Sequence, residues 1–144
     1  MNNDLMVFDV KPMAAPRMNK NSAWKFTNYW AYKDTLKLQA NIKGFTLPES
    51  IKVTFVMPLY KSYSKKKKRK LSLQPHQRTP DNDNLQKGLL DCLASQDNYV
   101  HDIHVNKIWA DFNDEYEGMR GCIIVRRTYK DEQIGTTLYD LIKR

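Results

Sequence analysis

The sequence predicts an α+β fold in a single domain: a small mixed β-sheet of about four strands packed with two or three helices. At 144 residues the chain has the length of one ordinary domain, and residues 1–144 contain no internal repeat. Four short apolar runs are typical of strands: residues 5–10, 51–57, 103–112 and 119–129. Three other stretches place their apolar residues at helical spacing: residues 29–42, 83–94 and 134–144.

The N-terminal part contains one predicted strand and one irregular segment. Residues 5–10 (LMVFDV) form a short apolar run suited to a strand. Residues 11–28 are interrupted by Pro12 and Pro16 and are predicted to be irregular. This segment carries Arg17 and could lie over an active site as a loop, while a solvent-exposed connector is the equal alternative.

A helix and a strand follow. Residues 29–42 are predicted to form a helix that ends at Gly44, with an apolar stripe of Tyr29, Tyr32, Leu36 and Ala40. Residues 51–57 (IKVTFVM) are rich in β-branched side chains and are predicted to form a strand that stops at Pro58.

The excess positive charge lies in one segment, residues 59–80, which we call the basic segment and predict to be a loop. It contains no acidic residue and eight basic ones: Lys61, Lys65, Lys66, Lys67, Lys68, Arg69, Lys70 and Arg78. Taking these eight from the 24 Lys and Arg leaves 16, which equals the 16 Asp and Glu. Such a segment indicates a polyanionic partner, with nucleic acid favoured over an anionic membrane. The six cations at 65–70 are predicted to repel and extend unless an anion binds, and a localisation signal or a solubilising loop is the alternative.

The next predicted element is a helix over residues 83–94, with Asp83 or Asn84 expected as its N-cap. Its predicted buried stripe consists of Leu85, Leu89, Leu90 and Leu93.

The C-terminal third is predicted to add the remaining strands. Residues 103–112 and 119–129 are expected to pair as an antiparallel hairpin with a six-residue loop. Residues 134–144 are expected to form a short terminal helix or a tail.

Four residues in and after the predicted helix suit phosphodiester chemistry: Asp81, Asp83, Lys87 and Asp102. Lys87 falls one helical turn beyond Asp83 on the same face, so the first three can converge at the helix start. Carboxylate oxygens are the ligands that Mg²⁺ prefers, and a lysine beside them can stabilise negative charge on phosphorus. The alternative is that the aspartates only cap the helix and that Asp91 forms an ion pair with Lys87.

Other reactive side chains predict no further site. Cys92 and Cys122 are expected to be buried thiols without a disulfide framework or a zinc site. His76, His101 and His104 share no metal-binding spacing with the cysteines and are predicted to be surface or core residues. No apolar segment approaches the ~18–20 residues that span a bilayer, and the N-terminus lacks the features of a signal peptide, so we expect a soluble intracellular protein without a membrane partner.

The acidic cluster resembles the signature of the RusA family of Holliday junction resolvases, which are common in bacteriophages and prophages. The resemblance rests on the run Asp81-Asn82-Asp83-Asn84-Leu85-Gln86-Lys87, on Leu90-Asp91, and on Asp102 with Val105 three residues later. It extends to the predicted strand at 51–57 with its Met57-Pro58 ending and to the strands after Asp102, and so covers the C-terminal two thirds.

This resemblance implies a RusA-like fold and a magnesium-dependent endonuclease that cuts four-way DNA junctions as a homodimer. By position, Asp81, Asp83 and Asp102 would bind the metal, with Mn²⁺ as an alternative ion, and Lys87 would be the catalytic lysine. His101 stands where family members often carry a second acid, which leaves Asp102 as the only ligand there.

The same resemblance divides the chain into a catalytic core, residues 81–128, and DNA-holding residues in the basic segment together with Arg17. It also implies a role in DNA recombination and repair in the cytoplasm of a bacterial host, with a phage or prophage gene as the source.

Three functions remain open from the sequence. The favoured one is a magnesium-dependent, structure-selective DNA endonuclease. The second is a non-catalytic nucleic-acid-binding protein that uses the lysine-rich segment and keeps the aspartates as helix caps. The third is a nuclease that cuts other branched DNA, such as flaps or replication forks.

Overall fold

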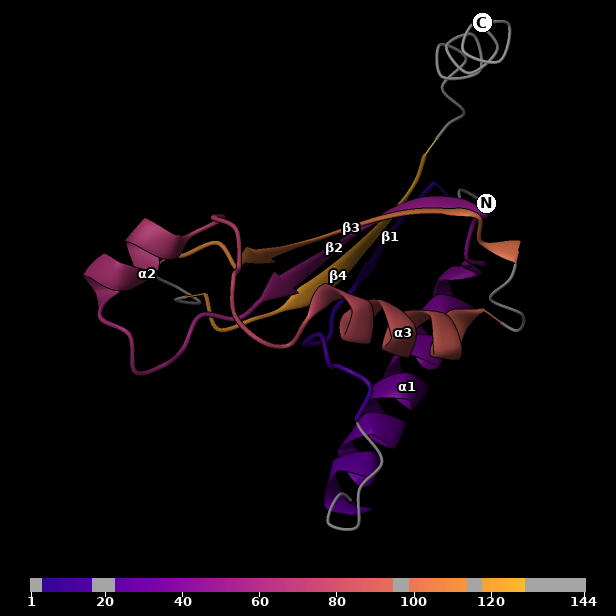
Figure 1. Cartoon of the computed structure of the whole chain (residues 1–144), viewed down its shortest axis with the longest axis horizontal. Coiled ribbons are helices and arrows are strands. Elements are labelled where there is room, and N and C mark those ends of the chain that lie inside the picture. The colour runs from indigo at the N-terminus through magenta and orange to yellow at the C-terminus, as the bar shows by residue number, and fades with distance from the viewer. Residues whose placement is uncertain (1–3, 17–22, 95–98, 114–117, 129–144) are drawn as a thin grey trace, which may run out of the picture.

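The computed structural model describes residues 4–16, 23–94, 99–113 and 118–128, and within them a four-stranded mixed sheet with three helices (Figure 1). The elements in chain order are β1 (Leu5–Phe8), α1 (Ala23–Lys43), β2 (Ser50–Met57), α2 (Lys65–Leu71), α3 (Asn82–Leu93), β3 (Asp102–Trp109) and β4 (Cys122–Arg127). The predicted α+β class, the four strands and the single small domain are confirmed. The predicted terminal helix over 134–144 lies outside the described residues.

The order of strands in the sheet is β1-β4-β2-β3, and it corrects the predicted hairpin. β3 and β4 are not neighbours, because β2 lies between them and pairs in parallel with β3 and antiparallel with β4. The connection over residues 110–121 is longer than the about 2–5 residues of a hairpin loop, so β4 can reach the far side of β2. β2 lies inside the sheet between β4 and β3, and in its second half consecutive residues are buried, as expected for a strand that is covered on both faces.

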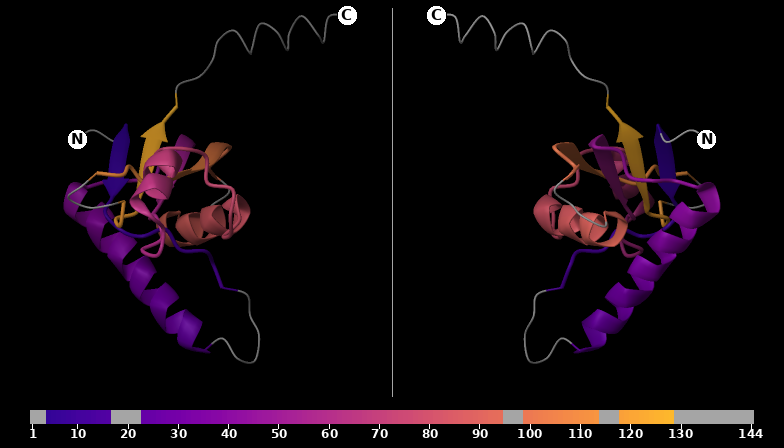
Figure 2. Two further views of the ribbon diagram at one scale, coloured as in Figure 1. Left: turned by 90° about the vertical axis from the view of Figure 1, so that its left-hand side faces the viewer. Right: turned by 90° about the vertical axis from the view of Figure 1, so that its right-hand side faces the viewer.

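Helices α1 and α3 cover one face of the sheet (Figures 1 and 2). Strand residues that face them alternate with residues that face away, as in β2, where Ile51, Val53, Phe55 and Met57 are all buried. The predicted stripe of α1 is confirmed, because Tyr29, Tyr32, Leu36 and Ala40 are buried. The predicted stripe of α3 is confirmed as well: Leu85 and Leu89 are fully buried, and Leu90 and Leu93 pack against the same core.

The run of six cations forms the helix α2 and is not extended, which corrects the prediction from charge repulsion. Ser64 caps the helix, since its Oγ accepts a hydrogen bond of 3.2 Å from the backbone N–H of Lys67. The Lys67 ammonium lies 3.9 Å from the centre of the Tyr63 ring, and the Arg69 guanidinium lies 5.4 Å from that of Phe112. These cation–π contacts, and the favourable position of cations at a helix C-terminus, offset the repulsion.

Two helix boundaries also differ from prediction. α1 begins at Ala23, six residues before the predicted start at position 29, and α3 has Asp81 at its N-cap position where Asp83 or Asn84 was expected. None of the three helices in the described ranges is long and apolar enough to span a bilayer.

Candidate active site and nucleic-acid interface

The start of α3 presents two carboxylates and a lysine to solvent. Asp81, Asp83 and Lys87 are all exposed, and Lys87 follows Asp83 by one helical turn on the same face. Although Asp81 occupies the N-cap position, its side chain makes no capping hydrogen bond. The capping alternative therefore does not account for Asp81, and its carboxylate is available to a ligand.

Lys107 of β3 holds the loop that leads into this helix. The Lys107 ammonium donates hydrogen bonds to the backbone oxygens of Pro80 at 2.7 Å and of Arg78 at 2.5 Å. On the other side, the backbone N–H of Ala15 donates to the backbone oxygen of Asn84 at 3.2 Å. Lys107 thus holds the loop before Asp81, and Ala15 holds the first turn of α3, which contains Asp83. The sequence analysis did not identify Lys107. Its position continues the alternation of Ile103 and Val105, so the side chain lies on the core-facing side of the strand, and this pattern could have indicated a structural role.

Asp102, the third predicted aspartate, is the first residue of β3 and is half-buried. Its Oδ2 accepts a hydrogen bond of 2.7 Å from Ser50 Oγ, which itself bonds Thr128 Oγ1. Since Ser50 has only one hydroxyl proton and gives it to Asp102, Thr128 is the donor in the second bond. The Asp102 carboxylate also lies 3.3 Å from the Nε2 atom of His104. These contacts orient the Asp102 carboxylate.

Within one copy of the chain, Asp102 stands apart from the other two aspartates. α3 runs back alongside β3, so that the start of the helix and the start of the strand lie at opposite ends (Figure 1). A helix of 12 residues is about 18 Å long. Lys107, which reaches Pro80, lies five residues along β3 from Asp102, or about 16 Å. Accordingly, no three His, Cys, Asp or Glu side chains among the described residues of one copy could hold a common metal ion.

Helix α2 of the basic segment lies beyond the ends of β2 and β3 that are nearer to the start of α3 (Figure 1), and the segment then returns alongside β3, where Pro75 pairs with Ile108. Seven of its eight cations are exposed: Lys61, Lys65, Lys66, Lys67, Arg69, Lys70 and Arg78. Lys68 is 3% exposed, so its side chain does not belong to a DNA-facing surface. Arg17 lies outside the described residues. The geometry thus supplies a strongly positive surface at the same end of the sheet as Asp81 and Asp83.

A family model for endodeoxyribonuclease RusA matches residues 8–122, well over half of the chain. The chain belongs to the RusA family. The matched residues include every described candidate for catalysis and metal binding, from Asp81 to Asp102, and they confirm the resemblance to the family. The match differs in extent from the expected C-terminal two thirds, because it begins at residue 8 and ends at residue 122. No curated protein matches the chain in a sequence search. By its family this RusA chain is an endodeoxyribonuclease, a hydrolase of DNA phosphodiester bonds.

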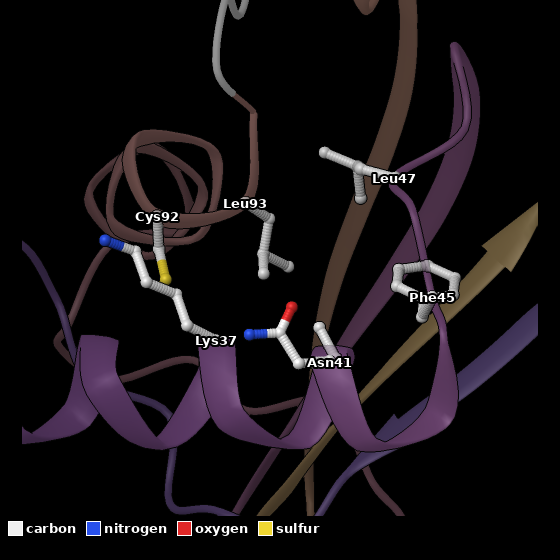
Figure 3. A pocket seen from close by; sticks show the side chains of 7 residues that line it. Lys37, Asn41, Phe45, Leu47, Cys92 and Leu93 are labelled. Atoms are coloured by element: carbon white, nitrogen blue, oxygen red, sulfur yellow. The ribbon is translucent and has the colours of Figure 1, made fainter.

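One cavity in the described part of this RusA chain is separate from Asp81, Asp83 and Asp102. A cavity of about 220 Å³ lies between α1 and the end of α3 (Figure 3), lined by Lys37, Ala40, Asn41, Phe45, Leu47, Cys92 and Leu93. The Cys92 thiol donates to the backbone oxygen of Lys33 at 3.2 Å, and burial raises the pKa of this thiol, so it stays protonated at neutral pH. Cys92 and the half-buried Cys122 are both free, in line with the prediction of no disulfide. The lining of this cavity therefore contains none of the residues predicted to be catalytic.

Proposed function

We propose that this RusA-family chain is a magnesium-dependent endonuclease that cuts four-way DNA junctions as a homodimer, in recombination and repair. The observation that carries the proposal is the exposed pair Asp81 and Asp83 at the start of α3, with Lys87 one turn beyond. The Asp81 side chain does not cap the helix, and the endodeoxyribonuclease family model matches this part of the chain. In a protein that only bound DNA, two exposed acids near its cationic surface would weaken binding, because they repel phosphate.

The donor set fits a hard divalent cation. Mg²⁺ commonly takes one or two protein carboxylates and completes its shell with water and substrate phosphate, so Asp81 and Asp83 suit it as a pair. When bound, the ion supplies Lewis-acid polarisation of a phosphoryl oxygen and a more acidic water. Mn²⁺ prefers the same oxygen ligands and is the expected substitute.

The chain's own residues then divide the work. Lys87 places a positive charge beside the aspartates, where it can stabilise negative charge that develops on the transferred phosphoryl group. Lys107 holds the loop before Asp81, and the exposed cations of α2 bind the DNA backbone. Ser50 orients Asp102 through its hydroxyl proton.

The position of Asp102 supports the proposed dimer. Because Asp102 lies at the far end of α3 from Asp81 in the same copy, it can join a site with Asp81 and Asp83 only if they come from another copy. A two-fold dimer would make two such sites, each with Asp81 and Asp83 of one copy and Asp102 of the other, and two-fold symmetry matches the paired strands of a junction.

The direct test is cleavage of a synthetic four-way junction labelled on each strand. With magnesium we expect nicks at symmetry-related positions in one pair of opposing strands, and no cleavage with EDTA. Forks, flaps and linear duplex of the same sequence measure how far the activity depends on the branch. A junction that stays intact with magnesium while the protein binds it would support a non-catalytic DNA-binding protein, and equal cleavage of flaps would support a broader branched-DNA nuclease.

The role of α2 is tested by the salt dependence of junction binding. Changing Lys65, Lys66 and Lys70 to glutamine removes three exposed cations and keeps good helix formers. Each lost phosphate contact removes about 0.9 from the slope of log K against log salt concentration, so we expect the slope to fall by about 2–3 units. The matched control changes Lys11, Lys37 and Lys43, which are exposed elsewhere, and should leave the slope unchanged. Equal slopes for both triple variants would contradict a DNA-binding role for α2.

A further inference from the structure

An aromatic cluster lies between the basic helix and the candidate active site. Trp109, the last residue of β3, is 3% exposed. The Tyr60 ring meets it edge-on with centroids 5.5 Å apart, and the Tyr63 ring lies 6.1 Å from Trp109 and 4.9 Å from Tyr60. His76 packs on the other side of Trp109 at 4.3 Å, and burial lowers the pKa of His76, so its ring is neutral at pH 7. The inner part of the cluster, Trp109 and His76, is therefore buried and uncharged.

The outer part of this cluster faces solvent. Tyr60 is 42% exposed and Tyr63 is half-buried, although both rings rest on a buried tryptophan. Because the two rings cover the buried Trp109 from outside, their outer sides are open to solvent and can contact a ligand. An exposed pair of rings with ordered positions provides a surface on which another flat ring can stack.

The charge around the two tyrosines selects the class of ring. The Lys67 ammonium lies 3.9 Å from the centre of the Tyr63 ring, Lys61 is exposed next to Tyr60, and the basic segment contains no acid. Cations interleaved with solvent-accessible aromatic rings are the arrangement that binds single-stranded nucleic acid, because phosphates meet the cations while bases stack on the rings.

The cluster is also tied to the loop that carries the candidate catalytic acids. The backbone N–H of Trp109 donates to Gln74 at 2.9 Å, and the backbone N–H of His76 donates to Lys107 at 3.0 Å. Lys107 in turn donates through its side chain to Pro80, the residue before Asp81. A base held by the tyrosines would thus belong to DNA near the phosphate that is cut.

We propose that Tyr60 and Tyr63 form a stacking platform for an unpaired nucleobase of the DNA substrate. The inference rests on the proposed function, since a four-way junction supplies unpaired bases at its branch point when its arms are opened. The platform gives a reason for preferring branched DNA over linear duplex, in which every base is stacked between its neighbours.

The test compares the affinities for a junction and for a linear duplex, measured with calcium in place of magnesium so that binding is measured without cleavage. Tyr60→Leu should weaken junction binding by about fivefold or more and leave linear duplex binding unchanged. Tyr63→Leu should weaken junction binding more than duplex binding, because the Tyr63 ring also contacts Lys67 of the DNA-binding helix α2. Tyr60→Phe and Tyr63→Phe are the matched controls and should bind both substrates as the unchanged protein does, because they keep the ring. Equal losses on junction and duplex, or no loss on either, would overturn the platform.

A second measurement needs no substitution and so does not depend on the variants folding. Ultraviolet irradiation of the unchanged protein on a junction with 5-iodouracil at the branch point should cross-link the peptide that contains Tyr60 or Tyr63, whereas 5-iodouracil within an arm should not. Cross-linking elsewhere only would refute the platform. Both measurements detect DNA binding and not cleavage. A chain that stacks the base but does not cut the junction would therefore contradict the proposed function without contradicting the stacking platform.

Discussion

Replacing Asp81 and Asp83 together with asparagine is expected to lower the rate of junction cleavage by about 100-fold or more and to leave junction binding intact or tighter. Asparagine keeps the shape of the side chain but removes the charge that attracts Mg²⁺, and lost stabilisation of phosphoryl charge commonly costs catalysis on this scale. Binding should tighten because two negative charges are removed from the neighbourhood of DNA phosphates. Initial cleavage rates with saturating magnesium and junction affinity with calcium measure the two effects separately.

Stability provides the control for this double variant. The Asp81 side chain makes no capping hydrogen bond, and asparagine is as good an N-cap as aspartate, so the midpoint of thermal unfolding should hardly change. Asp34→Asn, an exposed aspartate on α1, should change neither cleavage nor binding. Retained cleavage in the double variant would remove these aspartates from the mechanism. A loss of cleavage together with a large fall in the unfolding midpoint would instead indicate that they are structural caps.

The local elements were predictable because burial imposes the period of each element on the sequence. Tyr29 and Leu36 on α1, and Leu85 and Leu89 on α3, are buried as their helical spacing indicates. The placement of Asp83 and Lys87 on one face at the start of α3 was predictable for the same reason, because one turn of helix determines their relation and no distant contact is needed.

The pairing of strands was not predictable in this way. A strand with one buried face shows the same alternation whichever strand lies beside it, so residues 103–112 and 119–129 gave no sign that β2 separates them. The charge run at 65–70 misled for a related reason, since the rings of Tyr63 and Phe112 that stabilise α2 come from outside the run.

The position of Asp102 depends on the path of the chain between two elements. Its spacing from Asp81 in the sequence is compatible with a short distance in space, but the intervening helix carries the chain away before β3 begins. Lys107 was missed because a lysine within a strand usually faces solvent, whereas here it turns toward the loop before Asp81.

Dimers made from two different inactive variants of the chain are expected to regain cleavage. One chain carries Asp81→Asn with Asp83→Asn, and the other carries Asp102→Asn; each alone should be inactive. Dimers that contain one copy of each, isolated with two different affinity tags, should cut. If each site takes Asp81 and Asp83 from one copy and Asp102 from the other, such a dimer has one complete site and one that lacks all three acids. We therefore expect a nick in only one strand of the junction.

A second mixed dimer is the control, because shared sites predict that it is inactive and sites within one copy predict that it cuts. An unchanged copy is paired with a copy in which Asp81, Asp83 and Asp102 are all asparagine. If the sites are shared between copies, each site lacks at least one acid and the dimer should be inactive, although one copy has all three. If each site is built within one copy, this dimer should nick the junction and the first mixed dimer should not. Shared sites would make the dimer itself the condition for catalysis, since a lone chain holds Asp102 at the far end of α3 from Asp81.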